Sequence, residues 1–235
     1  MTKHQKALSS PKTFPIERKN RSWAIKPSAG PHPKDNCIPL GIVLRDILKY
    51  TENVSEVKKV LKEGQCDVDC KRVRDYRFPL GIFDTLRVGK EYFRLIPSKK
   101  GFKLIEISKK DSREKICRIE DKKSIGDGKL QLNLKDGRNI TVEEDKFRDL
   151  ETGSSVVIGL PEQEIKEVID LEEGQEVMIT EGKNRGDLAK FKEKKILRGS
   201  KKNRVIVLDD DEEVDLPEGL AIPIDSEKIQ LEAGD

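Results

Sequence analysis

The sequence predicts an α+β protein of several small domains, in which an extended arm precedes a helix–helix–hairpin module, a β domain and a small β-barrel. Three observations predict this class. Apolar residues recur at helical spacing between residues 40 and 61, whereas apolar and polar residues alternate at several places beyond residue 100. Charged residues make up 39% of the 235 residues and hydrophobic residues 34%. Such a composition favours several modest cores over one large core.

The net charge of +3 is the sum of two unlike halves. Residues 1–110 hold 25 basic and 12 acidic residues, whereas residues 111–235 hold 22 basic and 32 acidic residues. Residues 183–204 form a basic island in the second half, and residues 205–235 carry eleven acidic residues and one basic residue. Charge asymmetry of this kind indicates a nucleic-acid or membrane-surface partner.

Residues 1–37 form the expected N-terminal arm. The arm is basic and rich in proline, and its few apolar residues follow no period, so we expect it to become ordered against a partner. A mobile tail is the alternative. Trp23 is the only tryptophan, and it either stacks on a partner or pins the arm to the body of the protein.

Residues 38–97 form the expected helix–helix–hairpin module. Apolar residues on one face predict a helix over 40–48, which begins after Pro39, and a second helix over 54–61 that is capped by Asn53 and closed by Gly64. Two strands around Gln65–Val68 and Val73–Phe78 are then expected to meet in a turn at Asp69 and Cys70. Further strands are expected over 80–88 and 92–96.

Two β regions complete the chain. In the central β domain, 98–171, strands are expected around 130–134, 140–142, 156–158 and 165–169, with a tight turn at Asp136-Gly137. In the last domain, 172–235, strands over 177–179, 188–192 and 204–208 are expected to build the small barrel. Gly182 and Gly186 bracket a tight loop between the first two of these strands.

The sequence predicts no enzyme, cofactor or metal site. Both histidines lie in the arm, and no catalytic triad or phosphate-binding loop is recognisable. The four cysteines are expected to be free thiols, and Cys66 and Cys70 to be buried as small apolar residues. No apolar run approaches the roughly 20 residues that span a bilayer, and no secretory signal precedes the arm, so a cytoplasmic protein is expected.

Clusters of cations with interspersed aromatic residues instead predict binding to a polyanion with extended phosphate contacts. Aromatic side chains in such clusters can stack on exposed bases. A merely solvated face is the alternative for the lysines of the second helix. The candidate RNA-binding residues are Lys3, His4, Lys6, Lys12, Phe14, Arg18, Lys19, Arg21, Trp23, Lys26, His32, Arg45, Lys58, Lys59, Lys62, Lys71, Arg72, Arg74, Lys183, Asn184 and Arg185.

The order of these motifs resembles the archaeal and eukaryotic small-subunit ribosomal protein family called S-four-e, over essentially the whole chain. Residues 4–18, HQKALSSPKTFPIER, look like the signature of that family's arm. Residues 75–81, DYRFPLG, are similar to its S-four-type RNA-binding module. Gly174, Val177 and residues 182–186, GKNRG, are similar to a KOW motif, which is typical of a small SH3-like barrel.

The resemblance implies a non-enzymatic constituent of the small ribosomal subunit that binds ribosomal RNA directly and supports translation. Its expected partners are small-subunit ribosomal RNA and neighbouring ribosomal proteins, with no membrane and no small-molecule substrate. The acidic segment 205–235 is expected to face solvent or a basic protein neighbour. An RNA-modifying enzyme, or a translation or transcription factor that uses the same modules, is the alternative.

Overall fold

The computed structural model describes residues 4–197, 203–209 and 212–226. It is mostly β-structure with few helices, and it divides into two compact units, Met1–Arg113 and Glu114–Asp235. All strand pairs in the described residues are antiparallel. No helix within these residues has both the length and the apolar character that crossing a bilayer requires.

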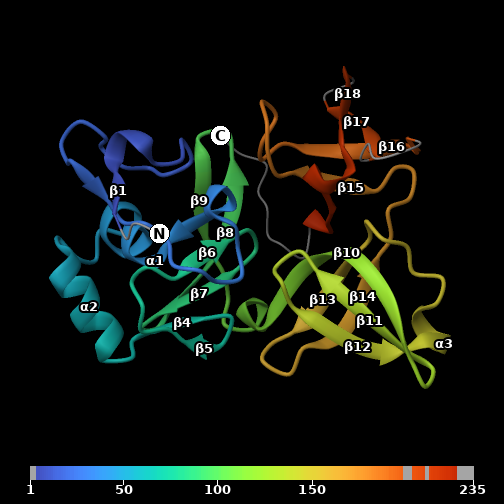
Figure 1. Ribbon diagram of the computed structural model, residues 1–235, viewed down its shortest axis with the longest axis horizontal. Coiled ribbons are helices and arrows are strands. Elements are labelled where there is room, and N and C mark those ends of the chain that lie inside the picture. Colours follow the sequence, from blue (N-terminus) through green and yellow to red (C-terminus); the bar gives the residue numbers. More distant parts are fainter. Residues whose placement is uncertain (1–3, 198–202, 210–211, 227–235) are drawn as a thin grey trace. The chain divides into compact units, whose positions relative to one another are not determined.

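The first unit is built on a five-stranded sheet in the order β5-β4-β7-β8-β9 (Figure 1). Its strands are β4 (Cys66–Val68), β5 (Lys71–Arg72), β7 (Thr85–Val88), β8 (Glu91–Ser98) and β9 (Gly101–Glu106). β9 lies beyond the expected module boundary at residue 97, yet it pairs along the length of β8. The first unit extends to Arg113 and therefore includes β9.

Both expected helices are present. The first begins as α1 (Leu40–Ile42) and continues as a π-helical turn, Val43–Ile47. The second, α2 (Val54–Lys62), has the predicted cap, since the Asn53 side chain accepts a 3.0 Å hydrogen bond from the Glu56 backbone N–H. Val57 and Leu61 are fully buried on its inner face. The helical period in the sequence therefore predicted the buried face of this helix correctly.

The expected strand over Val73–Phe78 is wrong. Only Lys71 and Arg72 pair with β4, across a two-residue turn in which Asp69 and Cys70 both have positive φ. The chain then turns, and the Tyr76 and Phe78 carbonyls accept hydrogen bonds from the backbone N–H groups that begin α1. Exposure of Cys70 follows from its place in the turn, so the expectation that it is buried is also wrong.

The expected strand over 80–88 is interrupted. β6 (Pro79–Gly81) pairs with β3 (Cys37–Pro39), and β7 begins only at Thr85. Between β6 and β7 the chain bends at Phe83, which has a positive φ of 63° and donates its N–H to the Leu95 carbonyl.

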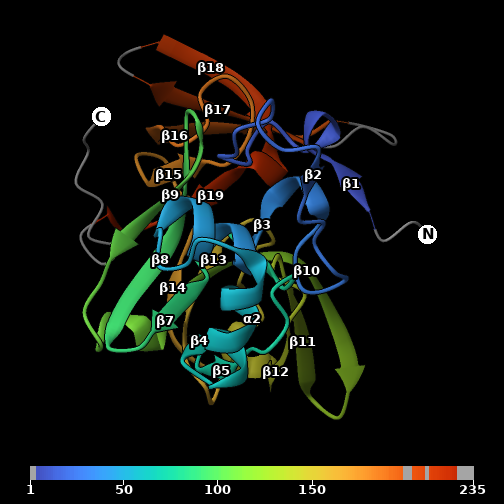
Figure 2. The ribbon, with the colours of Figure 1, turned by 90° about the vertical axis from the view of Figure 1, so that its left-hand side faces the viewer.

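Residues 4–37 of the arm pack against the rest of the first unit, whereas the sequence predicted that the arm becomes ordered against a partner. Its strands β1 (Gln5–Lys6) and β2 (Trp23–Ala24) pair with one another (Figure 2). Phe14 and Ile25 join the hydrophobic core that also contains α1 and α2. Phe14 and Ile25, together with the partly buried Ile16, thus anchor a segment that has no hydrophobic period of its own.

The second unit contains two five-stranded sheets. The central sheet has the order β12-β11-β10-β13-β14, with β10 (Glu114–Gly126), β11 (Lys129–Leu134), β12 (Asn139–Glu143), β13 (Ser155–Gly159) and β14 (Glu164–Ile169), and the short helix α3 (Glu144–Phe147) follows β12. The four strands expected here are confirmed, as is the turn at Asp136-Gly137. The long central strand β10 was not expected.

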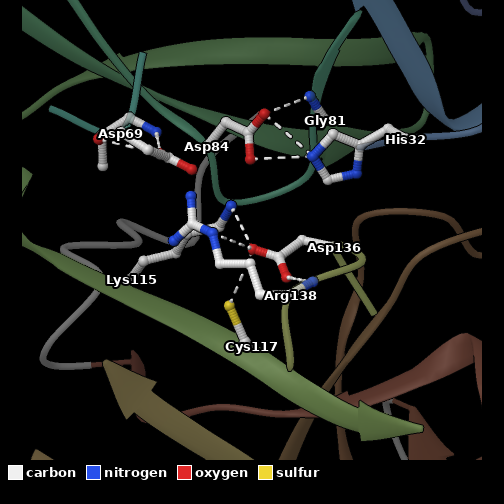
Figure 3. Close-up of polar contacts among 9 residues, drawn as sticks. His32, Asp69, Gly81, Asp84, Lys115, Cys117, Asp136 and Arg138 are labelled. Atoms are coloured by element: carbon white, nitrogen blue, oxygen red, sulfur yellow. Dashed lines mark hydrogen bonds and ion pairs between the residues drawn. The ribbon is translucent and has the colours of Figure 1, made fainter. Parts of the chain in front are cut away.

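Buried charged residues explain why the sequence of β10 shows no regular hydrophobic pattern. Lys115 and Arg118 lie among its apolar residues and are almost fully buried. The Lys115 ammonium is 2.9 Å from a carboxylate oxygen of Asp136, which also contacts Arg138 and accepts a hydrogen bond from the Cys117 thiol (Figure 3). Burial alone would raise the pKa of Asp136, but Lys115 and Arg138 outweigh burial and lower it.

The second sheet has the order β18-β17-β16-β15-β19. Its strands are β15 (Glu176–Ile179), β16 (Leu188–Lys195), β17 (Arg204–Asp209), β18 (Glu212–Pro217) and β19 (Ala221–Pro223). The three strands expected here are confirmed. Within the acidic segment 205–235, however, Val205, Val207 and Ile222 are buried, so the part of it that the structure describes does not simply face solvent.

Candidate nucleic-acid interface

Trp23 lies on the surface of the arm. In the β1–β2 ladder it is directly opposite Lys6, and the Lys6 ammonium is 3.9 Å from the centroid of its ring. The His4 ring centroid is 5.6 Å away. Trp23 is 54% exposed, so it is no staple for the arm, and an exposed indole beside a cation is suited to stacking on a nucleic-acid base.

Arg18 holds the arm in shape from within. Its guanidinium donates hydrogen bonds to the carbonyl oxygens of Ala7, Ser10 and Pro11 at 3.3, 2.8 and 2.6 Å. These carbonyls lie along the turn that leads from β1 toward Phe14. Arg18 therefore orders the backbone of the arm, and little of its donor capacity faces a phosphate.

Phe14 and His32 are internal as well, so they cannot stack on nucleic-acid bases as predicted. Phe14 is 2% exposed. The His32 Nε2 atom is 3.0 Å from both carboxylate oxygens of Asp84, which also accepts a hydrogen bond from the Gly81 N–H (Figure 3). A Cβ atom at Gly81 would lie 2.2 Å from the His32 ring. A glycine at this position therefore lets the arm pack against β6.

The remaining arm cations differ in exposure. Lys12, Lys19 and Arg21 are exposed and Lys26 is half-buried, whereas Lys3 lies outside the described residues. Arg21 lies 3.6 Å from the carboxylate of Asp46, which the Arg45 guanidinium also contacts with two hydrogen bonds of 3.0 and 2.7 Å. Since the Arg45 side chain is only 9% exposed, it neutralises Asp46 and does not offer a free surface charge.

A group of six exposed cations lies on α2, on β5 and on the residues directly after β5. We call these six residues the basic face: Lys58, Lys59, Lys62, Lys71, Arg72 and Arg74. Two contacts join its two segments. The Lys58 ammonium lies 5.0 Å above the ring of Tyr76, and the Arg72 guanidinium lies against Gly64, at the end of α2.

Asp67 contacts the basic face at one residue. It is 3.9 Å from Arg72, but Arg87 makes the closer contact with it, including a 2.7 Å hydrogen bond. The Arg72 side chain remains 58% exposed. The basic face therefore keeps most of its charge directed to solvent, where a polyanion can neutralise it.

Arg77 is a structural residue of this region that is not among the predicted binding residues. Its side chain donates a 3.1 Å hydrogen bond to the Lys26 carbonyl, and its own carbonyl accepts hydrogen bonds from the N–H and hydroxyl of Ser28 at 2.8 and 3.0 Å. These bonds join the arm to the loop before β6. Its position inside the family-like motif DYRFPLG was the available signal.

The loop between β15 and β16 exposes one of its three predicted binding residues. Lys183 is exposed, whereas Asn184 donates a 2.9 Å hydrogen bond to Asp209 of β17. Arg185 is 7% exposed, and burial lowers its pKa despite the opposing effect of Glu181. Asn184 therefore ties the loop to β17, Arg185 is buried, and Lys183 is the side chain that a partner can reach.

Family models match two parts of this chain. The RS4NT domain matches residues 1–35, and the model described as ribosomal family S4e matches residues 89–165. Curated relatives named small ribosomal subunit protein eS4 include one from Methanocella arvoryzae, 39% identical over 87% of this chain and 86% of the relative. The relative from Archaeoglobus fulgidus is 35% identical over 98% of each chain.

A solved structure has the same fold. The crystal structure of the ribosomal protein S4e from Thermoplasma acidophilum superposes with a TM-score of 0.69, over 81% of this chain and 96% of that chain, at 22% identity. The family resemblance expected from the motifs of the arm and the module is thereby confirmed. On the extent of its identity with the curated relatives, this chain belongs to the ribosomal family S4e.

Proposed function

We propose that this chain is a structural, non-enzymatic constituent of the small ribosomal subunit in the cytoplasm, and that it binds ribosomal RNA directly. Membership in the S4e family carries the first part of the proposal. The basic face carries the second, because six exposed cations gathered over one helix and one turn suit the phosphates of a folded RNA.

The exposed arm residues extend this interface. Lys6, Lys12, Lys19, Arg21 and Trp23 offer four charges and one stacking surface on a segment that is already folded. An interface that exists before binding loses less conformational entropy when the RNA docks than an arm that must first become ordered. The RNA-binding set therefore narrows from the full list of sequence candidates to the side chains that face solvent.

The module names follow from the same proposal. The helices and β4–β5 hairpin of the first unit correspond to an S-four-type RNA-binding module, residues 38–97. The sheet of β15 to β19 corresponds to a KOW-type, SH3-like barrel within residues 172–235, preceded by a central β domain whose sheet begins with β10 at Glu114. Support for the barrel comes from positive φ angles at Gly174, Gly182 and Gly186, which shape the loops as the motif requires.

Neighbouring ribosomal proteins are the second class of partner. The exposed Glu212 of β18 suits a basic protein neighbour, whereas Glu213 and Asp215 form ion pairs with Lys192 and Arg204 of the same chain. No small-molecule substrate or membrane enters this function.

Sucrose-gradient sedimentation of the full-length protein with small subunits tests the proposal. We expect stoichiometric co-migration with the subunits that survives a moderately high-salt wash. Protein that remains at the top of the gradient under all salt conditions would contradict it. Catalytic modification of the RNA by substoichiometric protein would favour the alternative of an RNA-modifying enzyme.

A further inference from the structure

A cavity of about 410 Å³ lies between the arm and the π-helical turn of the first unit. Its volume falls within the roughly 300–1,000 Å³ of pockets that hold small ligands. Ile16, Ala24 and Trp23 supply apolar and aromatic lining, and Thr51 and Arg21 supply polar lining. All these residues belong to one compact unit, so the cavity is part of the fold of that unit.

Thr51 marks the interior of this cavity. It is 6% exposed, and within the described residues its hydroxyl has no hydrogen-bond partner. Buried hydroxyls are nearly always hydrogen-bonded, because an unmade bond leaves the desolvation of the group uncompensated. A ligand that places a polar edge in the cavity would supply the missing partner.

The charged residues that line the cavity balance, with Arg21, Arg45 and Lys49 against Glu17, Asp46 and Glu52, so an anionic group of a ligand is suited only to its exposed cations. Arg21 and Lys49 are exposed at its edge, and Lys49 has a positive φ of 56°, a conformation that a lysine adopts at a cost. The acidic lining groups are Glu17, Glu52 and Asp46, and Arg45 neutralises the last of these with two hydrogen bonds.

We propose that this cavity holds one unpaired nucleotide of the bound RNA, with the base beside Trp23, its polar edge at the Thr51 hydroxyl and its phosphate at Arg21 and Lys49. The inference rests on the proposed function and specifies how part of that interface works. A base is the ligand that combines a flat aromatic surface with hydrogen-bonding edges and a neighbouring phosphate. RNA helices would then contact the basic face, while an extruded nucleotide contacts the cavity.

Trp23 fluorescence tests this proposal directly, because Trp23 is the only tryptophan in the chain. The probes are hexaadenylate, inorganic phosphate and an acidic hexapeptide, each titrated into the full-length protein. We expect quenching by hexaadenylate and none by the other two at equal concentration. Equal quenching by phosphate, or quenching by the peptide alone, would overturn the assignment to a nucleotide.

Two variants locate the base and the phosphate. Thr51→Val keeps the shape of the side chain and removes the hydroxyl, so we expect the affinity for hexaadenylate to fall about fivefold. Arg21→Gln changes an exposed side chain, so its fold is retained, and we expect a similar loss. Thr141→Val, at an exposed position of β12, is the matched control and should bind like the parent protein. Unchanged affinity in both cavity variants would refute the proposal.

Failure of this proposal and failure of the proposed function give different results. Protein that co-sediments with small subunits but shows no quenching by hexaadenylate would remove the cavity from the interface and leave the proposed function standing. Protein that shows quenching but does not co-sediment would contradict the proposed function instead.

Discussion

The docking of the arm onto the first unit makes a quantitative prediction for Phe14→Ala. Phe14 is 2% exposed and lies in the same core as α1 and α2, although it belongs to an arm with little other apolar surface. Truncation of a fully buried phenylalanine typically costs about 3–5 kcal/mol, from lost burial and the cavity left behind. Because Ile25 and the hydrogen bonds of the arm to Arg77 and Asp84 lie at residues 25–32, we expect this loss to undock residues 4–24 before the sheets unfold.

Urea unfolding followed by two signals separates these events. Trp23 fluorescence reports on the arm, since it is the only tryptophan, and far-UV circular dichroism reports mainly on the sheets. In the parent protein we expect the two transitions to coincide. In Phe14→Ala we expect the fluorescence transition at clearly lower urea, with earlier proteolytic cleavage of the arm.

Leu8→Ala is the matched control for this experiment. Leu8 lies in the same arm but is 77% exposed, so its truncation should change the free energy of unfolding by no more than about 0.5 kcal/mol. If Phe14→Ala behaved like Leu8→Ala, or if the arm of the parent protein were cleaved at once without RNA, the arm would not be docked by its apolar residues. The arm would then not be folded before it binds RNA.

Three further predictions concern charge. Replacing Lys58, Lys59 and Lys62 together by alanine should make the dependence of log affinity for small-subunit RNA on log salt less steep by about 2 to 3, and an unchanged slope in filter-binding titrations would show these lysines to be merely solvated. Lys115→Met should destabilise the second unit by about 3–5 kcal/mol in urea unfolding, because Asp136 stays buried without its closest cation, and Lys115→Met with Asp136→Leu should recover most of the loss. Since the pKa of Asp136 is lowered in the folded protein, its stabilisation is complete above the unfolded carboxyl pKa of about 3.9 and is lost as the pH falls through the folded value. Thermal unfolding of Asp136→Asn should therefore vary less with acid than that of the parent, and equal acid sensitivity would contradict this origin.

The fold was predictable where one face of an element is apolar and the other is polar. The period of α2, its Asn53 cap and the alternation in β11 all reported the structure correctly. β10 and β18 were missed for the opposite reason. β10 buries Lys115 and Arg118 in ion pairs, which interrupts its apolar pattern, and β18 offers only Val214 and Leu216 as alternating apolar residues beside three acidic ones, which is a weak strand signal.

The sequence predicted which part of the chain is cationic, but not which of its cations lie on the surface. The charge of residues 1–110 correctly indicated a cationic unit, and the basic face lies there. A sequence does not tell an exposed cation from one that binds its own chain, however. Arg18, Arg45 and Arg185 all looked like phosphate ligands, and all three are used inside the fold. The Thr51 hydroxyl had no signal in the sequence, because its significance lies in the cavity around it.

A map of RNA crosslinks along this chain in assembled small subunits tests the central claim most directly. The account predicts crosslinks at Trp23, along α2, at Lys71 to Arg74 and at Lys183, with none at the buried Phe14 or Arg185. Crosslinks confined to other surfaces, with the basic face and Trp23 unmodified, would contradict the claim that these side chains bind the RNA.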